Sequence, residues 1–150
     1  MAGFTAENVR IRRCAGDGVD VSGGRKLTLK SLKIEAFGDK GVSIGELAKV
    51  LLRDVEVSAG PVAVAIKDGS EVTLAFGEFR FITGSVLAVY TKKPRYGAAR
   101  LTATEVTVRD DDNPRHTAHG DAKLTVNGAR ISPSKGALER LFKLGYLGSR

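Results

Sequence analysis

The residues best equipped for chemistry in this 150-residue chain are Glu46, Lys67, Asp68 and Tyr90. Lys67 and Tyr90 stand 23 positions apart at the ends of two similar segments, and Glu46 and Asp68 stand 22 positions apart beside them. If these segments stack, the four side chains form a catalytic site in which Lys67 is a base or holds an anion. The acids would then hold a metal ion or a hydroxyl group. The alternative, which we prefer, is a structural charge ladder in which Lys67 neutralises Glu46 and Asp68, worth about 0–1 kcal/mol per exposed pair.

A second group lies in the one long interruption of the pattern, the segment 92–97. Val89 and Leu101 are twelve positions apart, where the preceding copy needs six. The insertion contains Lys92, Lys93, Arg95 and Tyr96. Insertions into repeat proteins tend to lie on the binding face, and tyrosine can stack on a sugar or base while the cations contact acids or phosphates. We predict that this loop, with Lys67 and Tyr90, binds a ligand; an ordinary solvated turn stiffened by proline is the alternative.

The acidic run Asp110, Asp111 and Asp112 is a candidate calcium site, because Ca²⁺ is bound through oxygen ligands. Asn113 follows the run, but the glycine and glutamate of an EF-hand loop are missing. A solvated acidic turn is therefore the preferred interpretation. Apart from this calcium ion, we expect no cofactor.

The two histidines and the single cysteine suggest packing rather than chemistry. His116 and His119 are expected to point to opposite faces of a strand, so they do not easily share a metal. We expect His116 to be packed and hydrogen-bonded, and His119 is an acid–base candidate. Cys14 is the only cysteine, which excludes an internal disulfide, and we interpret it as a small buried hydrophobe.

These residues can meet only if the chain coils, and a repeat of about 23 residues indicates that it does. Copies of one pattern, with inward residues at the second and fourth positions, occupy 18–22, 41–45, 63–67, 86–90 and 115–119. Such alternation indicates strands. A second and a third strand follow each copy, the last third strand being expected at Ala129 and Ile131, and a partial coil with Phe4, Val9 and Ile11 precedes them. Three strands per turn predict an all-β fold, a right-handed parallel β-helix of about five to six coils.

The two ends of this coil are expected to differ. An apolar stripe with a largely helical spacing runs through Leu138, Leu141, Phe142 and Leu144. We predict a helix that starts near Ser134 and caps the C-terminal end, with a membrane-surface or partner-binding helix as the alternative. The chain then divides into a β-helix over 1–133 and a capping helix with its tail over 134–150. The N-terminal coil has no cap, which suggests a homo-oligomer formed there or a fragment of a longer β-helix.

Composition favours an anionic partner. The formal net charge is +7 and the pI about 9.8, and nucleic acid, an anionic polysaccharide and an acidic membrane surface all fit that sign. No apolar run approaches the roughly 20 residues of a membrane span, and the first residues do not form a secretory signal. The compartment is not determined; an extracellular or cell-envelope location follows if the chain derives from a longer exported protein.

Several strings resemble those of a known family. They are GDGVDVSG (16–23), GDKGVSIGE (38–46), IKDGS (66–70) and YTKKPRYG (90–97). Over residues 4–131 they resemble bacterial proteins with pectate-lyase-like parallel β-helix repeats. The resemblance implies that carbohydrate binds along the outer face of one sheet, in a groove bordered by longer turns. It also implies lyase chemistry in which carboxylates hold Ca²⁺ on substrate uronates and an arginine or lysine is the base, although no complete set of these residues is matched.

Three functions follow from these observations. The first is a β-helix module, non-catalytic or marginally catalytic, that binds an anionic polysaccharide or similar polyanion through the first strand of each coil and the 92–97 loop. The second is a polysaccharide lyase or epimerase fragment centred on Glu46, Lys67, Asp68 and Tyr90. The third is a structural unit that self-assembles through its uncapped N-terminal coil. Nucleic acid is a less expected partner than polysaccharide.

Overall fold

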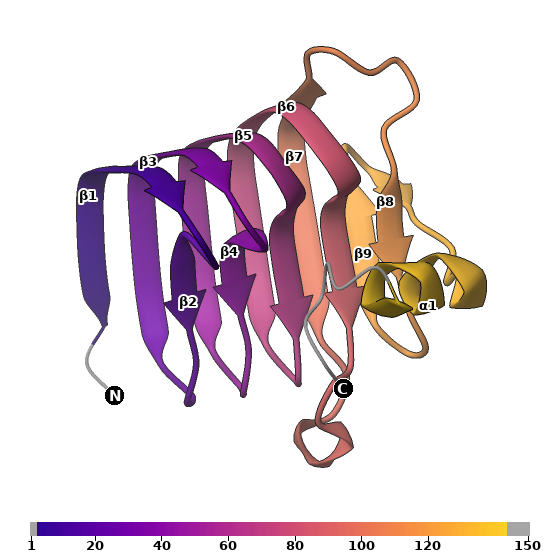
Figure 1. Cartoon of the computed structure of the whole chain (residues 1–150). Coiled ribbons are helices and arrows are strands. Elements are labelled where there is room, and N and C mark those ends of the chain that lie inside the picture. The colour runs from indigo at the N-terminus through magenta and orange to yellow at the C-terminus, as the bar shows by residue number, and fades with distance from the viewer. Residues whose placement is uncertain (1–2, 144–150) are drawn as a thin grey trace.

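The computed structural model describes residues 3–143, whose strands wind into a parallel β-solenoid of about five turns (Figure 1). Strand makes up 65% of the chain and a short C-terminal helix is present, which confirms the predicted all-β fold. In chain order the elements are β1 (Phe4–Cys14), β2 (Val19–Val21), β3 (Lys26–Phe37), β4 (Lys40–Ile44), β5 (Lys49–Lys67), β6 (Glu71–Tyr90), the 3-10 helix η1 (Pro94–Tyr96), β7 (Arg100–Val108), β8 (His116–Ala118), β9 (Lys123–Val126), β10 (Ala129–Arg130) and α1 (Lys135–Lys143).

Successive coils pair in parallel with the register that the repeat predicts. One outward column runs through Asp20, Ser43, Ala65, Ala88 and Thr117. Neighbouring strands lie about 4.8 Å apart, so equivalent residues form columns along the solenoid axis. A polar residue therefore has its neighbours one repeat away in sequence.

Corners divide each coil into three faces. The first face contains β2, β4, β8 and the C-terminal parts of β5 and β6. The second contains β9 and the N-terminal parts of β1, β3, β5, β6 and β7. The third face follows the second along each of these long strands. A column with positive φ, between 54° and 63°, marks the corner between the second and third faces: Asn8, Ser31, Asp54, Phe76 and Glu105. A single left-handed residue turns the chain sharply, and pairing resumes directly after it.

The interior is filled by columns of aliphatic and aromatic side chains. Leu52 and Leu74 align on the second face, and Ile34 and Phe79 lie in one column of the third. All four are 0% exposed. Burial of each such side chain stabilises the fold by about 1.5–3 kcal/mol, so the core fixes which residues face outward.

The last coil closes in a way that corrects the sequence prediction. Ala129 and Ile131 do not continue the parallel stack, because β10 folds back antiparallel on β9. The turn is Asn127-Gly128, with φ of 49° and 82°, the left-handed pair that a two-residue type I′ hairpin requires. The Asn127 side chain accepts a hydrogen bond from the Val106 N–H at 2.9 Å and donates one to the Val106 carbonyl at 3.0 Å. The hairpin thus ends the stack of parallel strands at β9, and one further parallel bridge follows on the first face, between Ala118 and Pro133.

Helix α1 lies beside the first face (Figure 1). Leu141 is 2% exposed and belongs to a small cluster separate from the main core. The other members are Val62, Ala65, Ala88 and Tyr90. The sequence predicts a helix that covers the end of the coil. The helix is present, but its Leu141 packs on the outward side of the first face. An apolar stripe shows that a helix has a buried side but not which surface covers it. The side chains of Leu138 and Phe142, and residues 144–150, lie outside the described part.

The opposite end is formed by β1, the terminal strand of the sheet. Phe4 aligns with Leu27 and Val9 with Leu32, which confirms the partial coil. Phe4 is 66% exposed, and Val9 is only partly buried against the core. Within residues 3–143, β3 is the only strand that pairs with β1.

Candidate functional site

Asp68 anchors the 92–97 loop. It lies at the corner after β5, has a φ of 55° and is fully buried. Its Oδ1 accepts hydrogen bonds from the backbone N–H groups of Lys92 at 2.7 Å and Lys93 at 2.6 Å. Hydrogen bonds to an ionised acceptor are about twice as strong as neutral ones. Asp68 therefore fixes the start of the loop and does not present its carboxylate to solvent.

Glu46, on the preceding coil, holds the same loop. Its Oε1 accepts a hydrogen bond from Nζ of Lys93. This bond lowers the pKa of Glu46 below its ordinary value, although desolvation acts to raise it. The same bond raises the pKa of Lys93. The predicted charge ladder is wrong at both acids: Lys93, rather than Lys67, pairs with Glu46, and Asp68 binds backbone N–H groups of the loop.

Arg95 and Tyr96 form the outer part of the loop. The Arg95 guanidinium lies 4.9 Å from the centroid of the Tyr96 ring, and its Nη2 donates a hydrogen bond to the Tyr96 hydroxyl at 3.3 Å. Arg95 is exposed, and Lys92 and Tyr96 are half-buried. Among the described residues, neither Lys92 nor Arg95 forms an ion pair with a carboxylate. The loop therefore combines an aromatic ring with two cations that form no ion pair with a described carboxylate.

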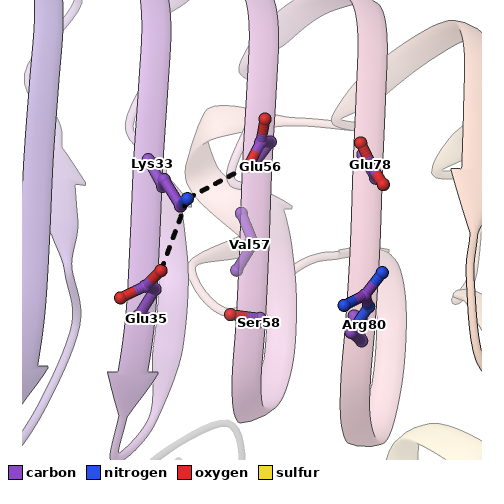
Figure 2. A pocket seen from close by; sticks show the side chains of 7 residues that line it. All are labelled: Lys33, Glu35, Glu56, Val57, Ser58, Glu78 and Arg80. Atoms are coloured by element: carbon purple, nitrogen blue, oxygen red, sulfur yellow. Dashed lines mark ion pairs between the residues drawn. The ribbon is translucent and has the colours of Figure 1, made fainter.

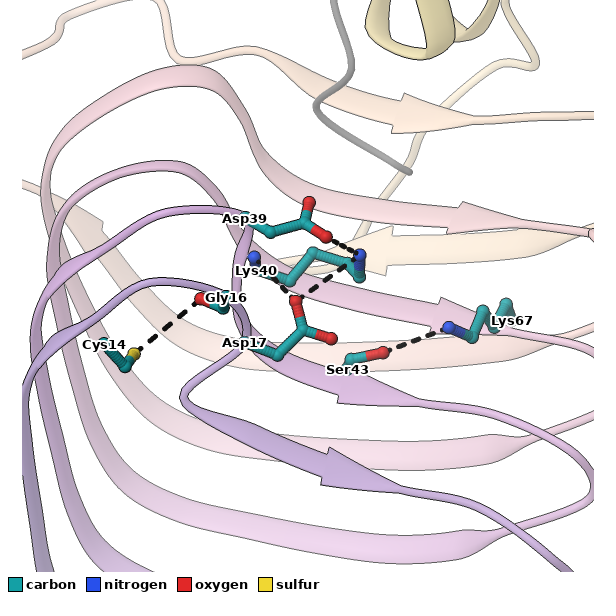
Figure 3. Close-up of polar contacts among 7 residues, drawn as sticks. All are labelled: Cys14, Gly16, Asp17, Asp39, Lys40, Ser43 and Lys67. Carbon is teal, nitrogen blue, oxygen red and sulfur yellow. Dashed lines mark hydrogen bonds and ion pairs between the residues drawn. The ribbon is translucent and has the colours of Figure 1, made fainter. Parts of the chain in front are cut away.

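Lys67 points toward Ser43 on the first face (Figure 3). Its Nζ donates a hydrogen bond to the Ser43 hydroxyl at 3.1 Å. Burial lowers the pKa of Lys67 below its ordinary value, and the charges of Lys40 and Lys92 lower it further. The structure thus brings Glu46 and Asp68 together with the loop but places Lys67 in a separate polar group.

That polar group contains a buried lysine which the sequence analysis did not identify as a site residue. The Lys40 side chain is 5% exposed, with Nζ 2.7 Å from Asp39 Oδ2 and 3.5 Å from Asp17 Oδ1 (Figure 3). Asp17 Oδ1 also accepts a hydrogen bond from the Lys40 backbone N–H at 3.0 Å. A buried ammonium needs such partners because removing one charge from water costs several kcal/mol. The available signal was the 23-residue displacement between Asp17 and Lys40.

Tyr90 is enclosed. It is fully buried in the cluster that contains Leu141. Burial raises the pKa of Tyr90, and the charges of Asp39 and Asp68 add to the effect. The ring therefore packs α1 against the first face, and in this arrangement a ligand on the surface does not contact it.

Two carboxylates of the acidic run accept hydrogen bonds from backbone N–H groups. Asp110 Oδ2 accepts a hydrogen bond from the Phe81 N–H at 3.1 Å, and Asp111 Oδ1 accepts one from the Asn113 N–H at 2.9 Å. Over residues 3–143, no group of three or more His, Cys, Asp or Glu side chains is arranged to hold a metal ion. A calcium site at Asp110, Asp111 and Asp112 stays a prediction. The loop that contains this run projects from the side of the solenoid opposite η1 (Figure 1).

The histidines and the cysteine are mostly packed. His116 lies inward in the column of Leu87, and burial lowers its pKa. Its Nδ1 is buried and has no hydrogen-bond partner within the described residues, so the expected hydrogen bond is not found at that atom. His119 Nδ1 is likewise buried and has no hydrogen-bond partner within the described residues. Cys14 is half-buried, and its Sγ donates a hydrogen bond to the Gly16 carbonyl at 3.7 Å (Figure 3).

The third face neutralises much of its own charge (Figure 2). Lys33 Nζ lies 3.5 Å from Glu35 Oε1 and 3.6 Å from Glu56 Oε2. Further ion pairs on this face are Arg12–Glu35 and Arg109–Glu78. Desolvation acts to raise the pKa of Glu35, but Arg12 and Lys33 outweigh it and the pKa is lowered. Such exposed pairs stabilise the fold little, but they engage three of the cations on this face, Arg12, Lys33 and Arg109.

Comparison with protein-family models, curated proteins and solved structures gives no match for this chain. Its class is therefore defined by its own strand pairing, which is that of a parallel β-solenoid. Within residues 3–143, no helix has the length and apolar character needed to cross a membrane.

Proposed function

We propose that this chain is a non-catalytic β-helix module that binds an anionic polysaccharide, or a similar polyanion, at the 92–97 loop. The observation that carries the proposal is that two acids hold the loop in place while two of its cations remain outside any ion pair. Asp68 holds the loop backbone and Glu46 holds Lys93, whereas Lys92 and Arg95 form no ion pair with any described carboxylate. A loop fixed in this way loses little conformational entropy when it binds.

The neighbouring side chains suit a charged sugar. The charge of Lys92 lowers the pKa of Lys67. The two ammonium groups therefore repel each other and favour an anion nearby. The half-buried Tyr96 ring offers an apolar surface beside Arg95, and arginine recognises carboxylates through two parallel hydrogen bonds. The resemblance of the repeats to bacterial pectate-lyase-like proteins supports a carbohydrate ligand, and we extend it to a proposed relationship with that superfamily.

The test is calorimetric titration with calcium-free polygalacturonate, comparing wild type with Lys92→Gln/Arg95→Gln. Both positions are free of ion pairs with described acids, so the fold should survive. We expect each lost charge to weaken binding about twofold to fivefold. Arg115→Gln, which removes an exposed charge elsewhere, is the matched control and should change little. Equal losses in the control and the loop variant would refute a specific site.

A lyase or epimerase is the second candidate, favoured by the lowered pKa of Lys67, because a general base works best when its pKa is near the working pH. The assay is the ultraviolet absorbance of unsaturated uronate products with Ca²⁺ present. Turnover that Lys67→Ala abolishes would replace the non-catalytic proposal. We expect no turnover by wild type.

Self-assembly is the third candidate, and the exposed Phe4 and open edge of β1 favour it. Antiparallel pairing of two β1 strands along the third face would bring Arg10 and Arg12 of both copies together. Salt screens such repulsion, so association should strengthen with ionic strength. Sedimentation velocity over a range of salt and protein concentration tests this; a strictly monomeric particle throughout would exclude it.

A further inference from the structure

Lys40 lies beside two carboxylates on the outward side of the first face (Figure 3). Its Nζ donates a hydrogen bond to Asp39 Oδ2 at 2.7 Å and lies 3.5 Å from Asp17 Oδ1. The Lys40 side chain is 5% exposed, and those of Asp17 and Asp39 are 20% and 29% exposed. An amine nitrogen and two carboxyl groups are therefore in contact at a position from which most water is excluded.

Backbone hydrogen bonds fix this cluster across two coils. Asp17 lies between β1 and β2, and Lys40 is the first residue of β4 on the next coil. The Gly18 N–H donates a hydrogen bond to the Lys40 carbonyl at 2.9 Å. The Asp39 N–H donates one to the Gly16 carbonyl at 3.3 Å. These bonds hold the backbone on both sides of Asp17, so the three side chains need little reorganisation to stay in contact.

The Asp17 carboxyl group is oriented as an acyl donor. Its Oδ1 accepts a hydrogen bond from the Lys40 backbone N–H at 3.0 Å. A donor at this oxygen stabilises the negative charge that develops there when a nucleophile attacks the carboxyl carbon. Lys40 Nζ lies 3.5 Å from this same oxygen, close to the separation of about 3–3.5 Å between groups that are poised to react.

Asp39 is placed to transfer protons. Its Oδ2 accepts the hydrogen bond from Lys40 Nζ. Its Oδ1 is buried and has no hydrogen-bond partner within the described residues, so one carboxylate oxygen stays available while the other contacts the ammonium group. Direct hydrogen-bond contact with the proton to be removed is the geometric requirement for a general base.

We propose that Lys40 and Asp17 form an isopeptide bond that joins two successive coils, with Asp39 as the general base. Asp39 takes a proton from the Lys40 ammonium, and the neutral amine attacks Cγ of Asp17. Asp39 then carries protons from the nitrogen to one Asp17 oxygen, the C–O bond breaks, and water leaves. One ammonium and one carboxylate thus become one amide and one water, without an oxidant or reductant, and Asp39 is regenerated. This modification is independent of the proposed function.

Two effects favour the amide over the separate ions. Well-oriented groups in one molecule react with effective molarities on the order of 10⁵–10⁸ M, which opposes hydrolysis of the bond. The amide also removes two charges from a position where water solvates them poorly. Lys33 provides the contrast: its Nζ lies 3.5 Å from Glu35 and 3.6 Å from Glu56, but its side chain is 40% exposed. We therefore expect the Lys33 pairs to remain ionic.

Intact-mass spectrometry of the purified chain is the direct test. Wild type should be lighter than its sequence mass by one water, about 18 Da. Asp17→Asn should expel ammonia instead of water, so its product should have the same mass as that of wild type. Lys40→Arg keeps a positive charge but has no nucleophilic amine, and Asp39→Asn has no base, so both should keep their full sequence masses. Lys33→Gln is the matched control and should lose one water as wild type does.

Peptide mapping locates the bond. Trypsin does not cleave after a modified lysine, so the digest should contain residues 14–25 joined to residues 34–49. A wild-type mass equal to that of the sequence would overturn the inference, whether or not the variants fold. A lost water that maps to any pair other than Asp17 and Lys40 would overturn it as well. The experiment uses no polygalacturonate, so either outcome leaves the proposed function unchanged.

Discussion

The anchoring of the 92–97 loop by Asp68 can be tested by substitution at that single position. Asp68→Gly removes both hydrogen bonds to Lys92 and Lys93 while it tolerates the positive φ. A hydrogen bond to a charged group contributes about 1.5–3 kcal/mol, so the two bonds stabilise the docked loop by about 3–6 kcal/mol. Asp68→Ala should be worse by about 1 kcal/mol, because a Cβ disfavours the left-handed backbone.

Asp68→Asn is the matched control. It keeps an oxygen acceptor and tolerates a left-handed backbone, but it loses the charge. Neutral hydrogen bonds contribute about 0.5–1.5 kcal/mol each, so the asparagine variant should lose about 2 kcal/mol of loop stability. The expected order of stability is wild type, asparagine, glycine, alanine.

Hydrogen exchange of the Lys92 and Lys93 amides is the appropriate assay, because the loop can detach while the solenoid stays folded. Urea unfolding followed by circular dichroism reports the global effect, which should be smaller. Unprotected Lys92 and Lys93 amides in the wild type would refute the reasoning. So would an asparagine variant as unprotected as the glycine variant.

Three further predictions concern the solenoid. Burial lowers the pKa of His116 below its ordinary value of 6.5, so the unfolded chain takes up this proton first as pH falls; the free energy of unfolding should therefore decline from about pH 6.5 downward. His116→Leu should remove this part of the decline in urea titrations at several pH values. Gly60→Ala should destabilise the fold by about 1–3 kcal/mol or more, because its Cβ would lie 2.2 Å from atoms of the buried Phe37 ring; Gly16→Ala, with nothing within 4 Å, should stay near wild type in thermal unfolding. Asn127→Gly should keep the hairpin turn but lose both hydrogen bonds to β7, and loss of about 1–3 kcal/mol in urea unfolding is expected; wild-type stability would contradict the proposed closure of the last coil.

The repeat predicted the solenoid and its register because buried columns constrain one residue per coil. Because Val64 and Leu87 are equivalent inward positions, Lys67 aligns with Tyr90. Side chains on the outward side escape this constraint. Lys93, rather than Lys67, binds Glu46. The 92–97 loop has no counterpart in the other coils, so the repeat alignment does not predict where its cations lie.

The ends of the solenoid were harder to predict than its middle. The Asn127-Gly128 pair is a strong hairpin signal, which the prediction of a further parallel strand at Ala129 and Ile131 does not use. The helix was found where its stripe indicated, but its docking surface depends on the outward residues Ala65 and Ala88, which a periodic alignment treats as solvent-facing. The enclosure of Tyr90 follows from that docking and could not be predicted from spacing alone.

The most direct test of the central claim is nuclear magnetic resonance titration of the isotope-labelled chain with oligogalacturonate. The account predicts shifts of the Lys92, Arg95 and Tyr96 amides. The amides of the third face, such as that of Lys33, should not move. Shifts centred on the third face, or no shifts at millimolar oligogalacturonate, would contradict the account.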